Sequence, residues 1–342
     1  MPINHATVKA KGDIGTHDEW NADHVNTWPS TPRSSATFVV AASDSNDPDL
    51  ADYQCDGTAD EVQINQAIQA LPASGGKIQL LEGTYEIAAK ILVNINYVQI
   101  SGTGVGTFIT LANNADDHMV QVGDADNDNT ATQFFLNGIW FNGNKANNAG
   151  VIYGLYLRNT SAQIRDCGIG FCNNDNIYSV PGIYDINLIR VRSYVSGNNG
   201  ITIQSDSSTV SKCEVFSNVG HGIYFASDAT GANGMIVCKI NENMIYSNGG
   251  DGVQLTNAWA GAPGLRTCVG NTISGNHSYG NAGWGININT ANVYNSIVME
   301  NFVLLNTAGT IQDNGVNTLP NGAMGTNTLA LDDHNQMLAA LP

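Results

Sequence analysis

The sequence predicts an all-β fold in which short parallel strands wind into a solenoid. Three observations predict it. A repeat of 22 to 33 residues runs through the second half of the chain. Each copy alternates apolar and polar residues after a turn rich in Asn and Gly. Only 13% of the residues are charged, whereas 37 are glycine. Units of this size cannot bury an apolar face alone, so they must stack as coils.

The N-terminal part of the chain differs from the repeats. Residues 1–36 are interpreted as an extension or linker, and residues 37–111 as a cap followed by the first coils. Within this cap, Thr58 and Glu61 have the spacing of a capping box, which predicts an amphipathic helix over 60–71. A helix ahead of the first coil can cover the open end of a solenoid core.

The coils are expected to fill residues 112–315, followed by a C-terminal tail at 316–342. The clearest copies are "FSNVGHGIYF" (216–225), "YSNGGDGVQL" (246–255) and "YGNAGWGINI" (279–288). The first apolar residue after each turn should stack inside the solenoid, and the next residue should point outward. These predicted interior positions are Ile177, Ile201, Ile223, Val253, Ile286 and Ile311.

Two further features of the repeats carry predictions. Asparagines in the turns could form a ladder of stacked amides; they are Asn173, Asn198, Asn218, Asn248, Asn281 and Asn306. The longer copies contain insertions at 227–234 and 257–266, and insertions in solenoids map to loops on one face, often the binding face.

Composition narrows the classes of partner. The net charge of −17 argues against nucleic acid and against anionic membrane surfaces. No apolar run approaches the roughly 18 residues of a membrane-spanning helix, and the first residues lack the apolar core of a signal peptide. The six cysteines have no metal-binding or redox spacing, so we expect buried free thiols.

A family resemblance appears in "DGTADEVQINQAIQALPASGGKIQLLEGTYEI" (56–87), "VQISGTGVGTFITL" (98–111) and the Gly-x-Gly-Ile coils. These segments resemble right-handed parallel β-helix proteins of the pectate-lyase-like superfamily, which include polysaccharide lyases, polygalacturonases, mannuronan epimerases and phage tailspike depolymerases. The resemblance implies right-handed coils and a protein that cleaves a polysaccharide as a lyase or glycoside hydrolase. A uronate C5-epimerase and a non-catalytic glycan-binding tail-fibre or adhesin solenoid are the alternatives.

A second resemblance lies at the C-terminus. "LDDHNQMLAALP" (331–342) is similar to the Asp-Asp-His-x-Gln-Tyr segments of phage tail fibres, with Met337 in place of the tyrosine. This similarity implies a virion tail or extracellular location, assembly as a homotrimer and other tail components as partners.

The candidate chemistry centres on the position two residues before each interior anchor. On adjacent coils this position would form a column about 5 Å apart, made of Asp175, Asn199, His221, Asp251 and Trp284. A histidine beside a carboxylate can act as an acid or base, and Asn199 could bind substrate. The segment "GHGIYF" (220–225) is similar to the Gly-His-Gly of polygalacturonases, but the paired aspartates and the Arg-x-Lys motif of that family are absent.

Hydrolysis would need two suitably spaced carboxyl groups. Asp175 and Asp251 should lie three coils apart, about 14 Å by coil spacing, which exceeds the roughly 5–9.5 Å of glycosidase pairs. Asp206 and Asp228 occupy equivalent positions on neighbouring coils and form a better spaced candidate pair. Their alternative role is to cap turns.

A lyase or epimerase would instead need a base and a cation for the uronate carboxylate. The candidate bases are His221, Tyr224 and Lys239. Candidate cations are Arg192 and Lys212, expected on adjacent coils with Glu242 next, and Arg266; a surface salt-bridge stripe is the alternative. The low basic content favours a neutral glycan or an acidic one neutralised by Ca²⁺. Trp259 and Trp284 are expected to stack on sugar rings.

Overall fold

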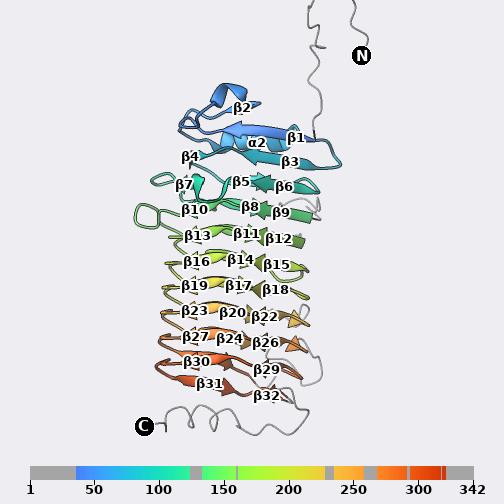
Figure 1. Cartoon of the computed structure of the whole chain (residues 1–342), viewed down its shortest axis with the longest axis vertical. Coiled ribbons are helices and arrows are strands. Elements are labelled where there is room, and N and C mark those ends of the chain that lie inside the picture. The colour runs from blue at the N-terminus through green and yellow to red at the C-terminus, as the bar shows by residue number, and fades with distance from the viewer. Residues whose placement is uncertain are drawn as a thin grey trace, which may run out of the picture. The chain divides into compact units, whose positions relative to one another are not determined.

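The computed structural model describes residues 36–123, 133–158, 161–227, 235–257, 268–290, 293–316 and 318–320. The chain divides into two units, Met1–Ser34 and Ser35–Pro342, and the first lies outside the described residues. The described part of the second unit contains one α-helix and three long parallel sheets (Figure 1). The predicted extension, the two insertion loops from residue 228 and residue 258 onward, and the segment 331–342 also fall outside the described ranges.

Sheet A is the longest of the three sheets. Its twelve strands pair in parallel in the order β2-β1-β3-β6-β9-β12-β15-β18-β22-β26-β29-β32. Their bounds are β1 (Thr37–Ala41), β2 (Tyr53–Gln54), β3 (Gly76–Leu80), β6 (Val98–Ser101), β9 (Gln133–Asn137), β12 (Ser161–Arg165), β15 (Ile186–Ile189), β18 (Thr209–Ser211), β22 (Lys239–Asn241), β26 (Thr272–Ser274), β29 (Ile297–Met299) and β32 (Leu319–Pro320).

Sheets B and C have nine strands each. Sheet B contains β4 (Gly83–Ile87), β7 (Thr107–Leu111), β10 (Trp140–Asn142), β13 (Gly168–Gly170), β16 (Arg192–Tyr194), β19 (Glu214–Phe216), β23 (Met244–Tyr246), β27 (His277–Tyr279) and β30 (Phe302–Leu304). Sheet C contains β5 (Ile91–Val93), β8 (Val120–Val122), β11 (Leu155–Leu157), β14 (Ile177–Ser179), β17 (Ile201–Ile203), β20 (Ile223–Ala226), β24 (Val253–Thr256), β28 (Trp284–Ile288) and β31 (Gly309–Asp313). A short pair, β21 (Met235–Ile236) and β25 (Cys268–Val269), lies outside the three sheets.

Each coil contributes one strand to sheet A, one to sheet B and one to sheet C, in that order, before the next coil begins. Crossovers between parallel strands of one sheet are almost always right-handed, and the structure is a right-handed parallel β-helix. The predicted fold class is therefore confirmed.

The predicted interior stack is confirmed residue by residue in sheet C. Ile177, Ile201, Ile223, Val253, Ile286 and Ile311 are consecutive Cα partners from β14 to β31. The first five side chains are fully buried. Because side chains alternate along a strand, this register also sets which residues face outward.

The cap contains helix α2 (Glu61–Gln69), whose apolar face buries Ile64, Ala67 and Ile68. The predicted capping box is wrong, because the Thr58 hydroxyl donates to Asp56 at 2.9 Å instead of capping the helix. Asp60, fully buried, precedes the helix and accepts the backbone N–H groups of Gly57 and Glu86, both at 2.9 Å. Its carboxylate thereby ties the start of α2 to β4.

The asparagine ladder forms with a different membership from the predicted one. Asn218, Asn248 and Asn281 each donate to the side-chain amide of the next member at 2.8–2.9 Å, ending at Asn306. All four lie five residues before their interior anchors. Asn173 and Asn198 were wrongly included. They lie four and three residues before their anchors, so their amides are out of register with the column, and Ser196 occupies the ladder position of its coil.

The cysteines are free and buried, as predicted; they are Cys55, Cys167, Cys172, Cys213, Cys238 and Cys268. Within the described ranges, no helix has the length and apolarity needed to cross a membrane.

Candidate functional site

The predicted column two residues before the interior anchors lies along the edge of sheet C, and its first four members share a structural role. The side chains of the first four members each accept the backbone N–H of the next residue in the column, whereas Trp284, the last member, has no acceptor atom. Asp175 accepts from Asn199 at 3.0 Å, and Asn199 accepts from His221 at 2.8 Å. His221 Nδ1 accepts from Asp251 at 2.9 Å, and Asp251 accepts from Trp284 at 2.6 Å. At these four positions the side chain thus has a structural role as a backbone acceptor.

The hydrogen bonds at His221 assign its tautomer. Because Nδ1 accepts the Asp251 N–H, the ring proton lies on Nε2. Burial lowers the pKa of His221, although the Asp251 carboxylate, 3.5 Å from Nδ1, opposes this shift. The ring also stacks on Tyr224, with centroids 5.5 Å apart. The structure thus holds His221 as a neutral group whose free atom is a hydrogen-bond donor.

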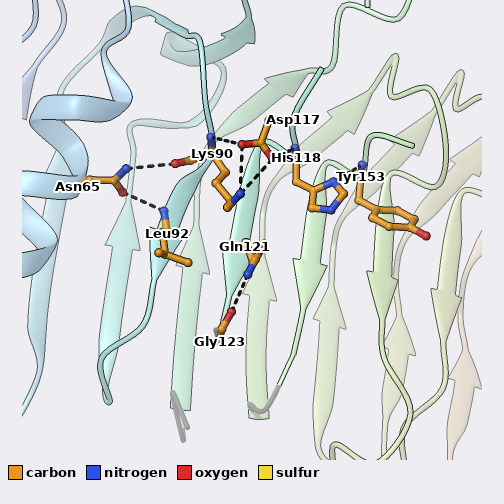
Figure 2. Close-up of polar contacts among 8 residues, drawn as sticks. All are labelled: Asn65, Lys90, Leu92, Asp117, His118, Gln121, Gly123 and Tyr153. Carbon is orange, nitrogen blue, oxygen red and sulfur yellow. Dashed lines mark hydrogen bonds and ion pairs between the residues drawn. The ribbon is translucent and has the colours of Figure 1, made fainter. Parts of the chain in front are cut away.

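The same column extends two coils further toward the N-terminus, where the sequence had not placed it. Val120, Leu155 and Ile177 are Cα partners, which puts His118 and Tyr153 in the column. The Tyr153 N–H donates to His118 Nδ1 at 3.3 Å (Figure 2). The sequence signal for placing Tyr153 in the column was Leu155, which lies 22 residues before Ile177. His118 had no such signal, because the coil before Leu155 lacks the Asn-x-Gly-x-Gly turn.

An aromatic and cationic group surrounds His118, and we call it the His118 cluster: Lys90, Asp117, His118, Tyr153, Tyr156, Arg158 and Tyr178. The His118 ring lies 5.0 Å from that of Tyr153 and 4.7 Å from that of Tyr156. Tyr153 stacks on Tyr178 at 4.6 Å. Figure 2 shows Lys90 just before β5 and Asp117 and His118 just before β8, with Lys90 Nζ 3.2 Å from the Asp117 carboxylate.

Two cations of the cluster differ in how they are neutralised. Lys90 is paired with Asp117, whereas Arg158 lies over the Tyr156 ring at 5.3 Å and makes no ion pair with any described residue. Arg158 can therefore receive an anionic group of a ligand.

Electrostatics keep the His118 imidazole and the Tyr153 phenol uncharged at neutral pH. Burial lowers the pKa of His118; Lys90 and Arg158 lower it further, and Asp117 opposes them. Burial, followed by neighbouring Tyr178 and Asp175, raises the pKa of Tyr153 to about 12. The imidazole is therefore neutral, and the Tyr153 phenol is a proton donor.

Outward-facing polar residues of sheet C extend from the His118 cluster toward the C-terminus. Gln121, Thr202, Gln254 and Asn287 face outward, yet 8% or less of each residue is exposed. Every internal segment outside the described ranges, including the two predicted insertion loops, follows a strand of sheet C. The column precedes the strands of sheet C, whereas these segments follow those strands in the chain.

The other predicted cations lie elsewhere. Lys239 begins β22 in sheet A and Arg192 begins β16 in sheet B, so neither shares a sheet with His221. The predicted alignment of Arg192 with Lys212 is wrong. Lys212 occupies the turn between sheets A and B, where its backbone N–H donates to Asn241. Arg192 pairs with Glu214 at 2.7 Å and Lys212 with Glu242 at 3.6 Å, which matches the alternative of a surface salt-bridge stripe.

The remaining predicted residues have separate positions. Asp206 accepts the Ile236 N–H at 2.9 Å and so caps a turn, and burial raises its pKa. Trp284 lies against Gly309, which leaves no room there for a Cβ atom. Asp228, Trp259 and Arg266 lie outside the described residues. No group of three or more His, Cys, Asp or Glu in the described ranges could hold a metal ion.

No protein-family model matches the chain, and no curated protein sequence matches it. Solved structures do match, and the three named here each align over 78% of this chain. They include the Agl-KA catalytic domain (16% identity, 51% of that chain, TM-score 0.58), ORF18 of Geobacillus virus E2 (17%, 60%, 0.54) and the A-module of the Azotobacter vinelandii mannuronan C-5 epimerase AlgE6 (16%, 91%, 0.50). At these identities the likeness concerns the fold. The chain is thus a right-handed parallel β-helix protein, similar in fold to carbohydrate-active and viral proteins.

Proposed function

We propose that this protein acts on an acidic polysaccharide and removes the proton at C5 of a uronate residue at the His118 cluster. The observation that carries this proposal is Arg158, a cation without a described carboxylate partner, beside a neutral imidazole and three phenols. A uronate needs a cation at its carboxylate while C5 loses its proton, because negative charge then builds up on that carboxylate.

The two histidines of the column differ in the length of the hydrogen bond that Nδ1 accepts. At His221 the corresponding bond is 2.9 Å long and holds the proton on Nε2. At His118 it is 3.3 Å long and therefore the weaker of the two. Moving the proton to Nδ1 frees Nε2 as a base but leaves the Tyr153 N–H without an acceptor, at a cost of about 1–3 kcal/mol. His118 is therefore the better candidate base, and the neighbouring tyrosines are candidate acids.

Two products can arise from the same proton abstraction. If a tyrosine protonates the departing O4, the chain is cut and an unsaturated uronate forms, which is lyase chemistry. If a proton returns to the opposite face of C5, the sugar is epimerised. One of the proteins similar in fold is a mannuronan C-5 epimerase, and both outcomes use the same residues.

Glycoside hydrolysis is supported less well. Asp175 and Asp251 are 2% and 5% exposed, and each accepts hydrogen bonds from the backbone of the next coil. Asp117 is paired with Lys90. None of these three carboxylates is free to protonate a leaving group in the way that a glycosidase acid must.

The test is turnover of a panel of uronate polysaccharides by the full chain. We expect either ultraviolet absorbance from unsaturated uronate or incorporation of solvent deuterium at C5. Arg158→Gln and His118→Asn should each lower the rate about 10²-fold or more. Asparagine keeps a backbone acceptor, as Asn199 does in its own coil, so the second variant should fold.

Arg190→Gln is the matched control, since Arg190 is exposed and paired with Asp166 at the turn between sheets A and B. It should leave the rate unchanged. Reducing ends without unsaturation or deuterium would identify a hydrolase and contradict the proposal. Glycan binding without any product would favour the non-catalytic solenoid. The virion tail location, the homotrimer and tail partners stay predictions from the resemblance.

A further inference from the structure

A buried acceptor without a partner lies on sheet C near His221. Asn287, 6% exposed, donates its amide N–H to Asp251 Oδ2 at 2.8 Å. The amide oxygen of Asn287, buried in the same place, accepts no hydrogen bond from any described group. Buried polar atoms are nearly always paired, so this oxygen is an unsatisfied acceptor for which a ligand can supply the donor.

The neighbouring groups are already occupied in ways that leave one donor free. Both oxygens of Asp251 accept N–H groups, from Trp284 and from Asn287. His221 Nδ1 accepts the Asp251 N–H, which leaves the Nε2–H, and the imidazole is 28% exposed. The three residues therefore offer a ligand one donor, His221 Nε2–H, and one acceptor, Asn287 Oδ1.

The charge of this group selects the kind of sugar. The Asp251 carboxylate is negative, the imidazole is neutral, and no described Lys or Arg bonds to either of them. A uronate carboxylate would be repelled here, because opposite charge is missing and like charge is close. A hydroxyl or an acetamido N–H can donate to Asn287 without such repulsion.

We propose that His221, Asp251 and Asn287 form a second subsite, which binds an uncharged sugar residue of the polymer. The inference rests on the proposed function for the first subsite at the His118 cluster. Four coils separate His118 from His221 along the column, about 19 Å by coil spacing. The substrate is then an acidic heteropolysaccharide that contains uncharged sugars as well as uronates, rather than a chain of uronates alone.

The experiment compares two ligands by calorimetry on the full chain. One is an oligosaccharide of alternating uronate and N-acetylhexosamine, and the other is an all-uronate oligosaccharide of equal length. The alternating ligand should bind about tenfold more tightly, as expected for one or two additional hydrogen bonds. Asn287→Ala should remove this preference and leave all-uronate binding unchanged.

A second variant guards against a folding defect. His221→Asn keeps an acceptor for the Asp251 N–H but removes the Nε2–H donor, so it should lose the same preference. Asn314→Ala is the control, because Asn314 is exposed and its amide donates only to Asn289 at 3.4 Å. Equal affinity for the two ligands, or equal losses for both in Asn287→Ala, would overturn the second subsite.

The two proposals fail separately. Turnover of all-uronate chains that depends on Arg158 but not on Asn287 supports the first proposal and overturns the second. A preference for the alternating ligand that depends on Asn287, without any product, supports the second subsite as a binding site and overturns the proposed chemistry.

Discussion

At the scale of single residues, a column of polar side chains that looked catalytic also stabilises the backbone. Asp175, Asn199, His221 and Asp251 each accept the N–H of the coil that follows. A polar residue at this position therefore has a structural role whether or not it binds substrate, although Trp284 shows that a coil can form without one. Histidine differs from the others because it keeps a second nitrogen for a ligand, and this property separates His118 and His221 from the rest of the column.

The structural part of this role can be measured at His221. His221→Ala leaves the Asp251 N–H without its acceptor and should lower the free energy of unfolding by about 1–3 kcal/mol. His221→Asn keeps an acceptor and should lose less than about 1 kcal/mol. Chemical denaturation checks both values, and equal losses in the two variants would argue against the backbone role.

The same residue predicts a pH dependence. Burial lowers the pKa of His221 below its ordinary value of 6.5, so the unfolded chain binds the proton more readily than the folded one. The contribution of the neutral His221 imidazole to the free energy of unfolding is complete above pH 6.5. It is lost as the pH falls below that value, because the unfolded chain then binds a proton that the folded chain does not. Between about pH 7.5 and 5.5, His221→Asn should lose less stability than the unchanged chain. Parallel profiles would contradict this assignment.

At the scale of elements, the turns between sheets B and C are joined by an amide ladder inside the coil. Asn248 accepts from the backbone and side chain of Asn218 at 3.1 and 2.9 Å, and donates to Asn281 at 2.9 Å. Aromatic rings form a comparable column on sheet B, where Phe216 and Tyr246 stack at 5.0 Å. Those rings turn their faces to each other, which leaves their edges for solvent.

The ladder predicts unequal effects of two similar substitutions. Asn248→Ala removes a buried amide with partners on both sides, so it should cost about 2–4 kcal/mol. Asn198→Ala, in the same turn of another coil, removes an exposed side chain with one bond to Asp175 and should cost about 1 kcal/mol or less. Denaturation curves of the two variants compare them directly. A larger loss for Asn198→Ala would contradict the observed register.

At the scale of the whole solenoid, each coil contacts only its neighbours, so stability depends on how the ends are closed. Helix α2 closes the N-terminal end by placing Ile64 and Ile68 against the core. Asp60 fixes the helix to β4. The first coils therefore depend on the cap more than the central coils do.

The cap can be tested by two substitutions on opposite faces of α2. Ile68→Ala empties a fully buried position and should cost about 2–4 kcal/mol. Val62→Ala, at a position that is 46% exposed, should change stability by about 0.5 kcal/mol or less. Hydrogen exchange should show faster opening of β1 and β3 in the Ile68 variant, and uniform opening of all coils would argue against local closure by the cap.

The sequence by itself determined the fold class and the register of sheet C, because stacked coils repeat the same apolar positions and the anchors from Ile177 to Ile311 recur without interruption. It also determined the column containing His221 and Asp251. The tertiary structure alone decided which asparagines join the ladder. The ladder position lies five residues before the anchor, and an asparagine one or two residues away from that position has its amide out of the column. It also brought Lys90, His118 and Arg158 together. These residues lie on coils whose irregular turns hide the repeat, and only the pairing of β5, β8 and β11 reveals that they are neighbours.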